Sequence, residues 1–233
     1  MTTRVALVTG SNRGIGLAIV RGLAEQGVHT ALVARTEGAA ARAAEPLRAE
    51  GLPVSAHQLD VTDVATIGRA VSDIVFEYGR LDILVNNAAV AIDRGFAASS
   101  LDQERVRATF EVNVFGAWRC VSAVVPVMKE QRYGRIVNLT THMASLSTMK
   151  GNSPAYRVSK TAVNAMTKVL ADELHEDGIL VNAASPGQAN TRMSYGAASQ
   201  TPDEAARDLL WLATLPSDGP TGGLFHGRER LPW

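Results

Sequence analysis

The stretch TGSNRGIG, residues Thr9–Gly16, decides the fold. It directly follows the apolar run Arg4–Val8, which has the length and composition of a buried strand. After it, Ile15, Ile19 and Leu23 recur every four residues, as in a helix with one apolar face. A strand, a glycine-rich turn and a helix in this order predict the first β–α unit of a nucleotide-binding sheet.

The glycines of this turn allow the backbone to bend sharply and to approach a pyrophosphate. The phosphates would then face the unpaired N–H groups at the helix N-terminus. A glycine-rich turn can also simply join a strand to a helix, so the weight of this one comes from its place at the first β–α junction. The residues expected to contact the dinucleotide here are Gly10, Ser11, Asn12, Arg13, Gly14, Ile15 and Gly16.

Strand-length apolar runs alternate with helical periodicity along the rest of the chain. The further expected strands are Thr30–Ala34, Val54–Leu59, Leu81–Val85, Arg135–Leu139, Leu180–Ala184 and Gly223–Phe225. Helix starts are expected at Thr62-Asp63, Leu101-Asp102, Pro154 and Thr201. Parallel strands need crossover connections, so this order predicts an α/β fold. We expect residues 1–233 to form a single domain, a doubly wound Rossmann-type parallel sheet of about seven strands with helices on both faces.

The composition is that of a globular protein with no charge bias. Apolar residues make up 46% of the 233 positions, and 23 basic side chains balance 23 acidic ones, so nothing favours nucleic acid or an anionic membrane as a partner. Cys120 is the only cysteine and lies in an apolar helical setting, where a thiol acts as a small filler. No signal-peptide pattern and no apolar run of about 18 residues is apparent, so we expect a cytoplasmic protein.

Several motifs occur in a fixed order after the glycine turn, whose spacing is G-x-x-x-G-x-G. They are LDVTD at Leu59–Asp63, NNAA at Asn86–Ala89, NVFG at Asn113–Gly116, YRVSK at Tyr156–Lys160 and SPG at Ser185–Gly187. Together they resemble the short-chain dehydrogenase/reductase family over almost the whole chain. The segments SPAYRVSKTAVNA and LATLPSDGPTGG resemble its carbonyl-reductase-like branch. The family pattern usually reads NNAG, so Ala89 departs from it.

The residue after the second strand indicates which dinucleotide binds. An NAD enzyme of this fold usually has an acidic residue there to bind the ribose 2′-hydroxyl, whereas this chain has Arg35. Its guanidinium suits a 2′-phosphate, and Arg13 can approach the same group, so we expect NADP(H). The resemblance implies further cofactor contacts, made by Asp60, Val61, Asn87, Ala88, Pro186, Gly187, Ala189 and Thr191.

Tyr156 and Lys160 are four residues apart on an expected helix, so both face the same side. A nearby ammonium favours the phenolate and should lower the pKa of the tyrosine, which suits it to proton transfer near neutral pH. The resemblance implies that Tyr156 is the catalytic acid/base and that both side chains also contact the cofactor. It further implies that Asn113 kinks its helix and holds a water in a proton relay to Lys160. A helix-bending asparagine without catalytic duty is the alternative.

Family members generally read V-N-V-S-S after the fifth strand, and the second serine donates a hydrogen bond to the substrate oxygen. The segment Val137–Thr141 places Thr141 at that serine's position, and threonine keeps the hydroxyl. Thr141 lies fifteen positions before Tyr156, slightly more than is common. Ser145, at a spacing of eleven, is the second candidate, and the absence of a working donor is the third.

The substrate is expected in the crevice beyond the carboxyl ends of the strands. Its expected walls are Val90–Phe96, Met143–Met149 and Gln188–Gln200, with His142, Met143, Met149, Gln188, Met193 and Tyr195 as pocket residues. An exposed or merely packed His142 is favoured over a proton shuttle. These walls are mostly apolar, which predicts a medium-sized apolar ketone or aldehyde as a small-molecule substrate.

Three functions are consistent with these residues. The first is NADPH-dependent carbonyl reduction or the reverse alcohol oxidation. The second is a redox-neutral dehydration, isomerisation or cyclisation, suggested by the altered serine segment, and the third is a non-catalytic NADP(H) sensor. No metal site is expected. By resemblance, a homodimer or homotetramer would form through the helices around Asn113 and Tyr156.

Overall fold

The computed structural model describes residues 3–187, 189–190 and 200–233. The strands are β1 (Val5–Val8), β2 (His29–Ala34), β3 (Val54–Gln58), β4 (Ile83–Asn86), β5 (Gly134–Leu139), β6 (Ile179–Ala184), β7 (Leu224–His226) and β8 (Glu229–Leu231). The α-helices are α1 (Gly14–Glu25), α2 (Glu37–Ala49), α3 (Val64–Tyr78), α4 (Gln103–Phe110), α5 (Ala117–Gln131), α6 (Pro154–Leu174) and α7 (Pro202–Ala213).

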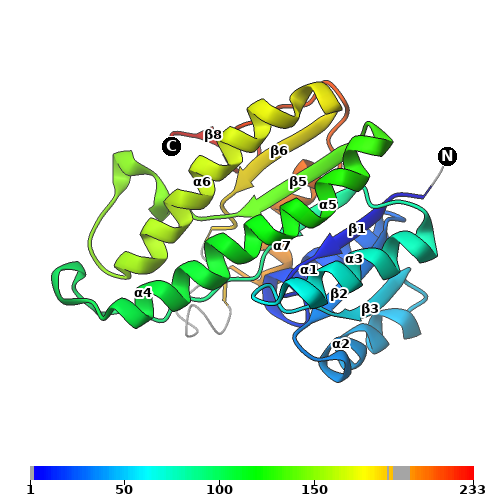
Figure 1. The fold of residues 1–233 in the computed structure, drawn as a ribbon, viewed down its shortest axis with the longest axis horizontal. Helices are drawn as coiled ribbons and strands as arrows, with labels where there is room; N and C mark the ends of the chain where they lie inside the picture. The colour runs from blue at the N-terminus through cyan, green and yellow to red at the C-terminus, as the bar shows by residue number, and fades with distance from the viewer. Residues whose placement is uncertain (1–2, 188, 191–199) are drawn as a thin grey trace.

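The described strands form one sheet in the order β3-β2-β1-β4-β5-β6-β7-β8 (Figure 1). The neighbouring strands from β3 to β7 pair in parallel, and the order reverses between β1 and β4. The doubly wound parallel sheet predicted from the sequence is therefore confirmed. The prediction of about seven strands missed β8, which pairs antiparallel with β7. The strand is short and two of its three residues are charged, so it carries none of the apolar signal of a buried strand.

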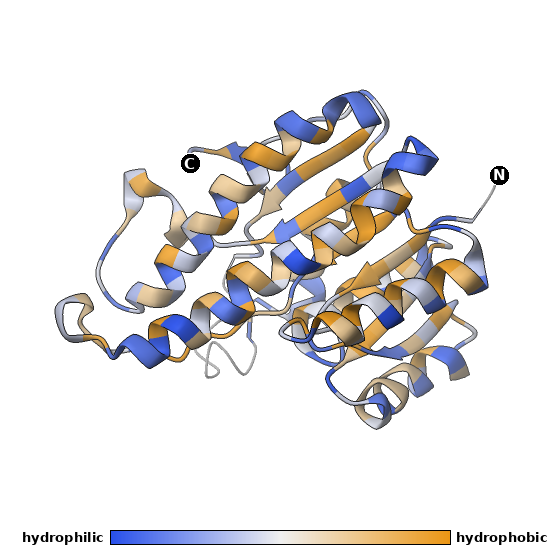
Figure 2. Cartoon of the chain, viewed as in Figure 1, coloured by the Kyte–Doolittle hydropathy of each residue, from blue (hydrophilic) through white to orange (hydrophobic). Residues whose placement is uncertain are grey.

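Helices cover both faces of the sheet, and each face has its own apolar core. One core lies under α3, α5 and α6 and contains Ile67, Val121 and Leu170. The other lies under α1, α2 and α7. Figure 2 shows the strands mostly in the hydrophobic colour, with hydrophilic residues alternating along the helices. Cys120 is fully buried in the first core, where burial raises the pKa of its thiol to about 12, so the prediction of an inert filler is confirmed.

The helix starts expected from capping residues are also confirmed. Asp63 and Asp102 accept backbone N–H groups at the starts of α3 and α4, and Thr201 forms a capping box with Glu204 at α7. The helix α2 was not predicted. Its N-cap is Thr36, whose hydroxyl accepts the N–H of Ala39.

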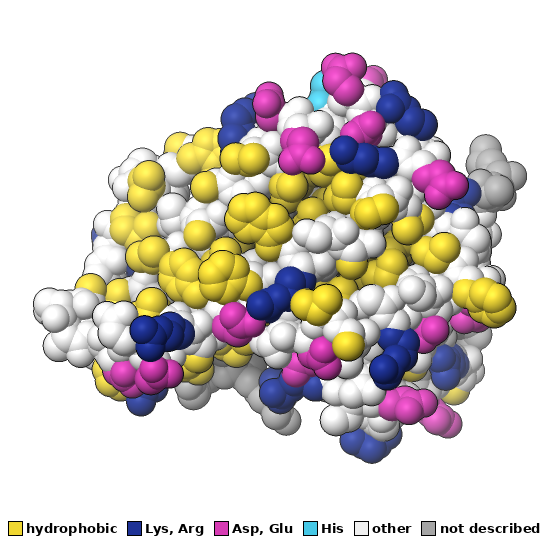
Figure 3. Space-filling view, viewed as in Figure 1, with side chains coloured by type: hydrophobic (Ala, Val, Ile, Leu, Met, Phe, Trp, Pro, Cys, Tyr) yellow, Lys and Arg dark blue, Asp and Glu magenta, His cyan; other side chains and the backbone are white. Residues whose placement is uncertain are grey.

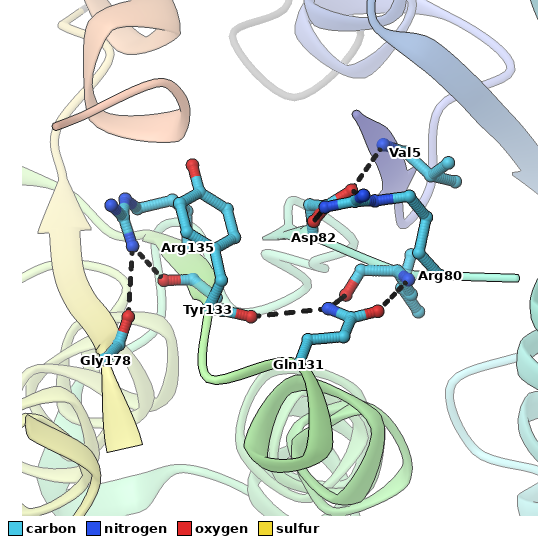
Figure 4. Close-up of polar contacts among 9 residues, drawn as sticks. Val5, Arg80, Asp82, Gln131, Tyr133, Arg135 and Gly178 are labelled. Carbon is cyan, nitrogen blue, oxygen red and sulfur yellow. Dashed lines mark hydrogen bonds and ion pairs between the residues drawn. The ribbon is translucent and has the colours of Figure 1, made fainter. Parts of the chain in front are cut away.

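The amino edge of the sheet is held by buried polar side chains (Figure 4). The carboxylate of Asp82 is fully buried and accepts hydrogen bonds from the Arg80 guanidinium at 2.7 and 2.8 Å and from the Val5 N–H at 2.8 Å. Arg135, fully buried on β5, donates to three backbone carbonyl groups and lies 4.1 Å from the centroid of the Tyr133 ring. These contacts fix the end of the sheet opposite the crevice, so they belong to the scaffold.

The segment Gln103–Gln131 is the one helical stretch in the described residues that is long and apolar enough to cross a membrane by length and composition alone. Its apolar residues Val121, Val124 and Met128 are buried in the core of the sheet. The stretch contains a π-helix at Glu111–Gly116 between α4 and α5. Its packing against the sheet accounts for the apolar residues on its buried face.

Candidate active site

The glycine turn lies where two segments of backbone come very close together. Gly10 has φ +60°, and a Cβ on it would lie 2.9 Å from the Cα of Ala88. A Cβ on Gly16 would lie 2.5 Å from Nδ2 of Asn87 and 2.7 Å from the carbonyl oxygen of Gly10. Both positions therefore require glycine. Gly10 needs it for its positive φ and to avoid a clash, and Gly16 only to avoid a clash.

Side-chain hydrogen bonds join this turn to the end of β4. The hydroxyl of Thr9 accepts the N–H groups of Asn87 and Ala88, each at 3.0 Å. The Asn87 amide donates back to the carbonyl oxygens of Thr9 and Gly10 at 2.8 and 3.0 Å. The two segments expected to contact the dinucleotide are thus fixed to each other.

An open cleft of about 1490 Å³ runs across the carboxyl edge of the sheet. Among the predicted cofactor and catalytic residues, those that line it are Gly10, Asn12, Arg13, Gly14, Ile15, Gly16, Arg35, Asp60, Val61, Asn87, Ala88, Tyr156, Lys160 and Pro186. Lining residues that were not predicted include Thr36, Thr140, Asn190 and Pro202. The glycine turn, Tyr156 and Lys160 thus line one and the same cleft.

Ser11, predicted to contact the dinucleotide, is not among the residues that line the cleft. Its side chain is fully buried, and its hydroxyl oxygen accepts the N–H of Val33 at 2.8 Å while its own N–H donates to the carbonyl oxygen of Val33 at 3.2 Å. Ser11 therefore ties the glycine turn to β2 and does not line the cleft. The sequence alone does not show whether a serine in this turn faces a phosphate or the neighbouring strand.

The ribose end of the cleft has the charge expected for a 2′-phosphate. Arg13 and Arg35 are both exposed at its rim, and among the described residues neither guanidinium forms an ion pair with a carboxylate. The carboxylate of Asp60 accepts two hydrogen bonds from Thr62, at 2.8 and 2.9 Å. The carboxylate thus shapes the turn that precedes α3, and the two arginines supply the cationic groups.

Tyr156 and Lys160 both line the cleft from α6, as their spacing predicted. Lys160 is buried, and its Nζ donates to the carbonyl oxygen of Leu139 at 2.7 Å and lies 6.0 Å from the centroid of the Tyr156 ring. Burial lowers the pKa of Lys160 to about 8 and raises the pKa of Tyr156 to about 12, although the nearby charge of Arg157 acts to lower the latter. The sequence predicted a lowered pKa for Tyr156, and this prediction is wrong for the chain alone. The loss of hydration on burial raises the pKa more than nearby positive charge lowers it.

Asn113 lies inside the π-helix, so the predicted distortion of its helix is present. Its side chain is buried and makes three hydrogen bonds. The Oδ1 atom accepts the N–H of Val90 at 2.8 Å, and Nδ2 donates to the carbonyl oxygen of Val90 at 2.9 Å and to Oγ of Ser159 at 3.0 Å. Ser159 in turn donates to the carbonyl oxygen of Tyr156 at 2.7 Å. The Asn113 side chain thus fixes the segment after β4 next to α6.

Two threonines at the end of β5 present their hydroxyls differently. Thr140 lines the cleft, and its buried Oγ1 has no hydrogen-bond partner among the described residues. The Oγ1 of Thr141 accepts the N–H of Met143 at 3.2 Å, which leaves its hydroxyl hydrogen free to donate. Ser145 is buried and shares a 2.7 Å hydrogen bond with Ser147. The sequence had not singled out Thr140, because the family pattern points to the second hydroxyl.

The expected substrate residues are only partly described. His142 is exposed, Met143 and Met149 are half-buried, and none of the three lines the cleft. Gly187 has φ +73° beside Gln200, and Ala189 is buried; neither is among the residues that line the cleft. The predicted residues Gln188, Thr191, Met193 and Tyr195 lie outside the described part of the chain.

Comparisons with known proteins agree with this fold and cleft. The model of the short-chain dehydrogenase family matches residues 4–202. Carbonyl reductase (NADPH) 1 of Macaca fascicularis is 34% identical over 277 aligned positions, which cover 99% of this chain and 98% of the relative. Among solved structures, gluconate 5-dehydrogenase from Burkholderia cenocepacia in complex with NADP and tartrate has a TM-score of 0.87 at 29% identity, covering 97% of this chain and 94% of that one. The actinorhodin polyketide ketoreductase with NADPH has a TM-score of 0.86 at 29% identity, covering 96% and 95%.

The doubly wound sheet and the glycine-lined cleft define a dinucleotide-dependent oxidoreductase. The chain belongs to the short-chain dehydrogenase/reductase family and resembles its carbonyl reductases. Its cofactor is NADP(H), in agreement with the arginines at the ribose end of the cleft.

The two threonine hydroxyls can be separated by mutation. If Thr141 donates to the substrate oxygen, Thr141→Val should lower kcat by roughly a hundredfold or more, whereas Thr141→Ser should retain activity. Steady-state kinetics with one ketone at saturating NADPH measure the effect, with Thr140→Val assayed in parallel. A larger loss in Thr140→Val than in Thr141→Val would transfer the role to Thr140.

Proposed function

We propose that this chain uses NADPH to reduce the carbonyl of a medium-sized, mostly apolar ketone or aldehyde, or runs the reverse alcohol oxidation, with Tyr156 as the acid/base. Residues 1–233 would act as one NADP(H)-binding domain, in the cytoplasm. The observation that carries the proposal is that Tyr156 and Lys160 line the same cleft as the glycine turn. The carbonyl reductases and ketoreductases among its relatives and structural neighbours support a carbonyl substrate.

The protonation state of Tyr156 suits a proton donor. Burial raises its pKa to about 12, so in the chain alone the phenol is protonated throughout the neutral range. Bound NADPH supplies the hydride, and the carbonyl oxygen then needs one proton, which the phenol of Tyr156 can give. Lys160, with its pKa lowered to about 8, remains mostly charged at pH 7 and can stabilise the phenolate that is left.

Buried residues next to the cleft orient the reacting groups. Asn113 and Ser159 hold the backbone of Tyr156 and of Val90, and a threonine hydroxyl at the end of β5 would donate a hydrogen bond to the carbonyl oxygen. The predicted water relay through Asn113 and Lys160 would return a proton to Tyr156. Both hydrogens of the Asn113 amide are already donated to Val90 and Ser159, so a relay water would bond to the backbone of Asn113 or to the second lone pair of its Oδ1.

The activity of Tyr156→Phe tests the proposal. We expect wild-type protein to consume NADPH with members of a panel of apolar ketones and aldehydes, and Tyr156→Phe to lose at least about a hundredfold in kcat because the proton donor is gone. Nicotinamide absorbance measures the rate, and cofactor affinity is the control for folding. Product formation without net oxidation of NADPH would favour the redox-neutral alternative, and binding without turnover of any compound would favour the sensor.

Arg35 provides a test of the cofactor contacts. Arg35→Asp should remove an attraction for the 2′-phosphate and add repulsion, shifting the ratio of kcat/KM for NADPH over NADH by on the order of a hundredfold towards NADH. Arg42→Asp on α2 is a matched control for the change of charge and should leave the ratio unchanged. An unaltered ratio in Arg35→Asp would contradict the assignment of Arg35 to the 2′-phosphate.

A second copy of the chain is the partner we propose for the face made by α3, α5 and α6. Phe115, Trp118, Val158 and Val169 are about half-exposed on α6 and on the helical stretch that includes α5. Figure 3 shows hydrophobic side chains gathered on the face that these helices form. Phe115 and Trp118 also border a hollow of about 450 Å³ between α3 and α5. A two-fold axis near α5 would place each Trp118 against the hollow of the other copy.

A charge in this face should break such a dimer. We expect Trp118→Glu to be monomeric under conditions in which wild-type protein has at least twice the mass of one chain, because the carboxylate would lose its hydration at the contact. Light scattering after size-exclusion chromatography measures the mass. Phe76→Glu is the control, since Phe76 on α3 is 95% exposed and does not border the hollow. A wild-type monomer would refute the proposal.

A further inference from the structure

The helix that carries Tyr156 and Lys160 starts without a capping side chain of its own. Ser153 is at its N-cap position, with φ 50° and ψ 53°, and its hydroxyl caps no N–H group. A capping serine has an extended backbone, which directs its side chain back to the helix. The left-handed backbone of Ser153 does not direct the hydroxyl to the helix. Pro154 follows and has no N–H group. The first N–H groups of α6 that need an acceptor therefore belong to Ala155 and Tyr156.

A carboxylate from a distant part of the sequence accepts both of these N–H groups. Oδ2 of Asp93 lies 2.6 Å from the backbone nitrogen of Ala155 and 3.2 Å from that of Tyr156. The side chain is fully buried, its Oδ1 has no hydrogen-bond partner, and no arginine or lysine in the described residues forms an ion pair with it. The positive end of α6 is therefore what compensates its charge.

Asp93 also belongs to the segment that borders the cleft. The segment leaves β4 through Asn87 and Ala88, which are bonded to Thr9, and continues to Val90, which lines the cleft. Asn113 holds Val90 by its N–H and its carbonyl group, and Asp93 follows three residues later. The same loop is therefore fixed to the glycine turn, to the π-helix and to the start of α6.

The backbone of Tyr156 is consequently held on both sides. Asp93 accepts its N–H, and Ser159, bonded to Asn113, donates to its carbonyl oxygen. We propose that Asp93 is a positioning residue, whose carboxylate fixes the phenol of Tyr156 relative to the cofactor-binding loop. This inference rests on the proposed function, in which Tyr156 gives a proton to the substrate. A displacement of about 1 Å is enough to slow such a transfer strongly.

Two substitutions separate positioning from simple stabilisation. Asp93→Ala removes the acceptor, and we expect kcat for ketone reduction to fall on the order of tenfold to a hundredfold while NADPH affinity stays within about twofold, because the glycine turn is untouched. Asp93→Asn keeps an amide oxygen that can accept the Ala155 N–H, and should recover most of kcat. If Asp93→Ala does not fold, Asp93→Ser replaces it, since its hydroxyl is too short to reach α6.

Asp102→Ala is the matched control. It removes another carboxylate cap, which accepts the N–H of Glu104 at 3.0 Å at the start of α4 and does not line the cleft. We expect it to lower thermal stability without lowering kcat. Wild-type kcat in Asp93→Ala or Asp93→Ser would overturn the proposal, and so would a loss of NADPH affinity as large as the loss of kcat, which would indicate general loosening of the site.

Amide hydrogen exchange of the peptide that spans residues 154–160 provides a readout that needs no turnover. With NADPH bound, we expect faster exchange there in Asp93→Ala than in wild-type protein or Asp93→Asn, and no change in Asp102→Ala. If wild-type protein reduced no carbonyl, the proposed function would fail, and this exchange would still decide whether Asp93 fixes the start of α6. Equal exchange in wild-type protein and Asp93→Ala would overturn the positioning role.

Discussion

The hydroxyl of Thr9 makes the contacts on which the site depends. It lies at the end of β1 and accepts the two backbone N–H groups that follow β4, those of Asn87 and Ala88. The strand order reverses between these two strands, so their loops diverge and leave a crevice above the sheet. The loops can approach this closely only because Gly10 and Gly16 have no side chain. A Cβ at either position would collide with the neighbouring segment. The glycine turn and the loop after β4 are therefore held together as one unit.

From this unit, buried polar groups extend into α6, the helix that carries Tyr156 and Lys160. Asn113 bonds to Val90 on one side and to Ser159 on the other, and Ser159 bonds to the backbone of Tyr156. A buried polar group that loses its partner costs about 1–3 kcal/mol, so each of these bonds strongly restrains the next. A second buried network behind the cleft connects Asn86 on β4 to Asn138 on β5 and onward to α6. The position of the phenol is thus a property of several elements together.

Sequence reasoning succeeded where the signal is local. The glycine turn, the capping residues Asp63 and Asp102, and the four-residue spacing of Tyr156 and Lys160 depend only on neighbours along the chain, and the structure places each as expected. It failed where distant segments decide the outcome. Nothing near Asp93 in the sequence indicates that its carboxylate accepts the N–H of Ala155, 62 positions later. Nor does the sequence around Ser11 indicate that its hydroxyl faces β2. The unpartnered hydroxyl of Thr140 likewise follows from the path of the chain after β5.

The pKa values of Tyr156 and Lys160 show the same limit in energetic terms. The sequence places an amine beside a phenol and suggests an ion pair, yet Lys160 donates to the carbonyl oxygen of Leu139 instead. Both side chains lose hydration in the fold, and this disfavours the charged form of each, so the phenol pKa rises to about 12 and the amine pKa falls to about 8. A phenol in this state holds its proton until negative charge develops on a neighbouring oxygen. The raised pKa makes the phenol a weaker acid, so the proton transfer proposed for Tyr156 would depend on positive charge close to the phenolate as well as on the distance and alignment of the acceptor.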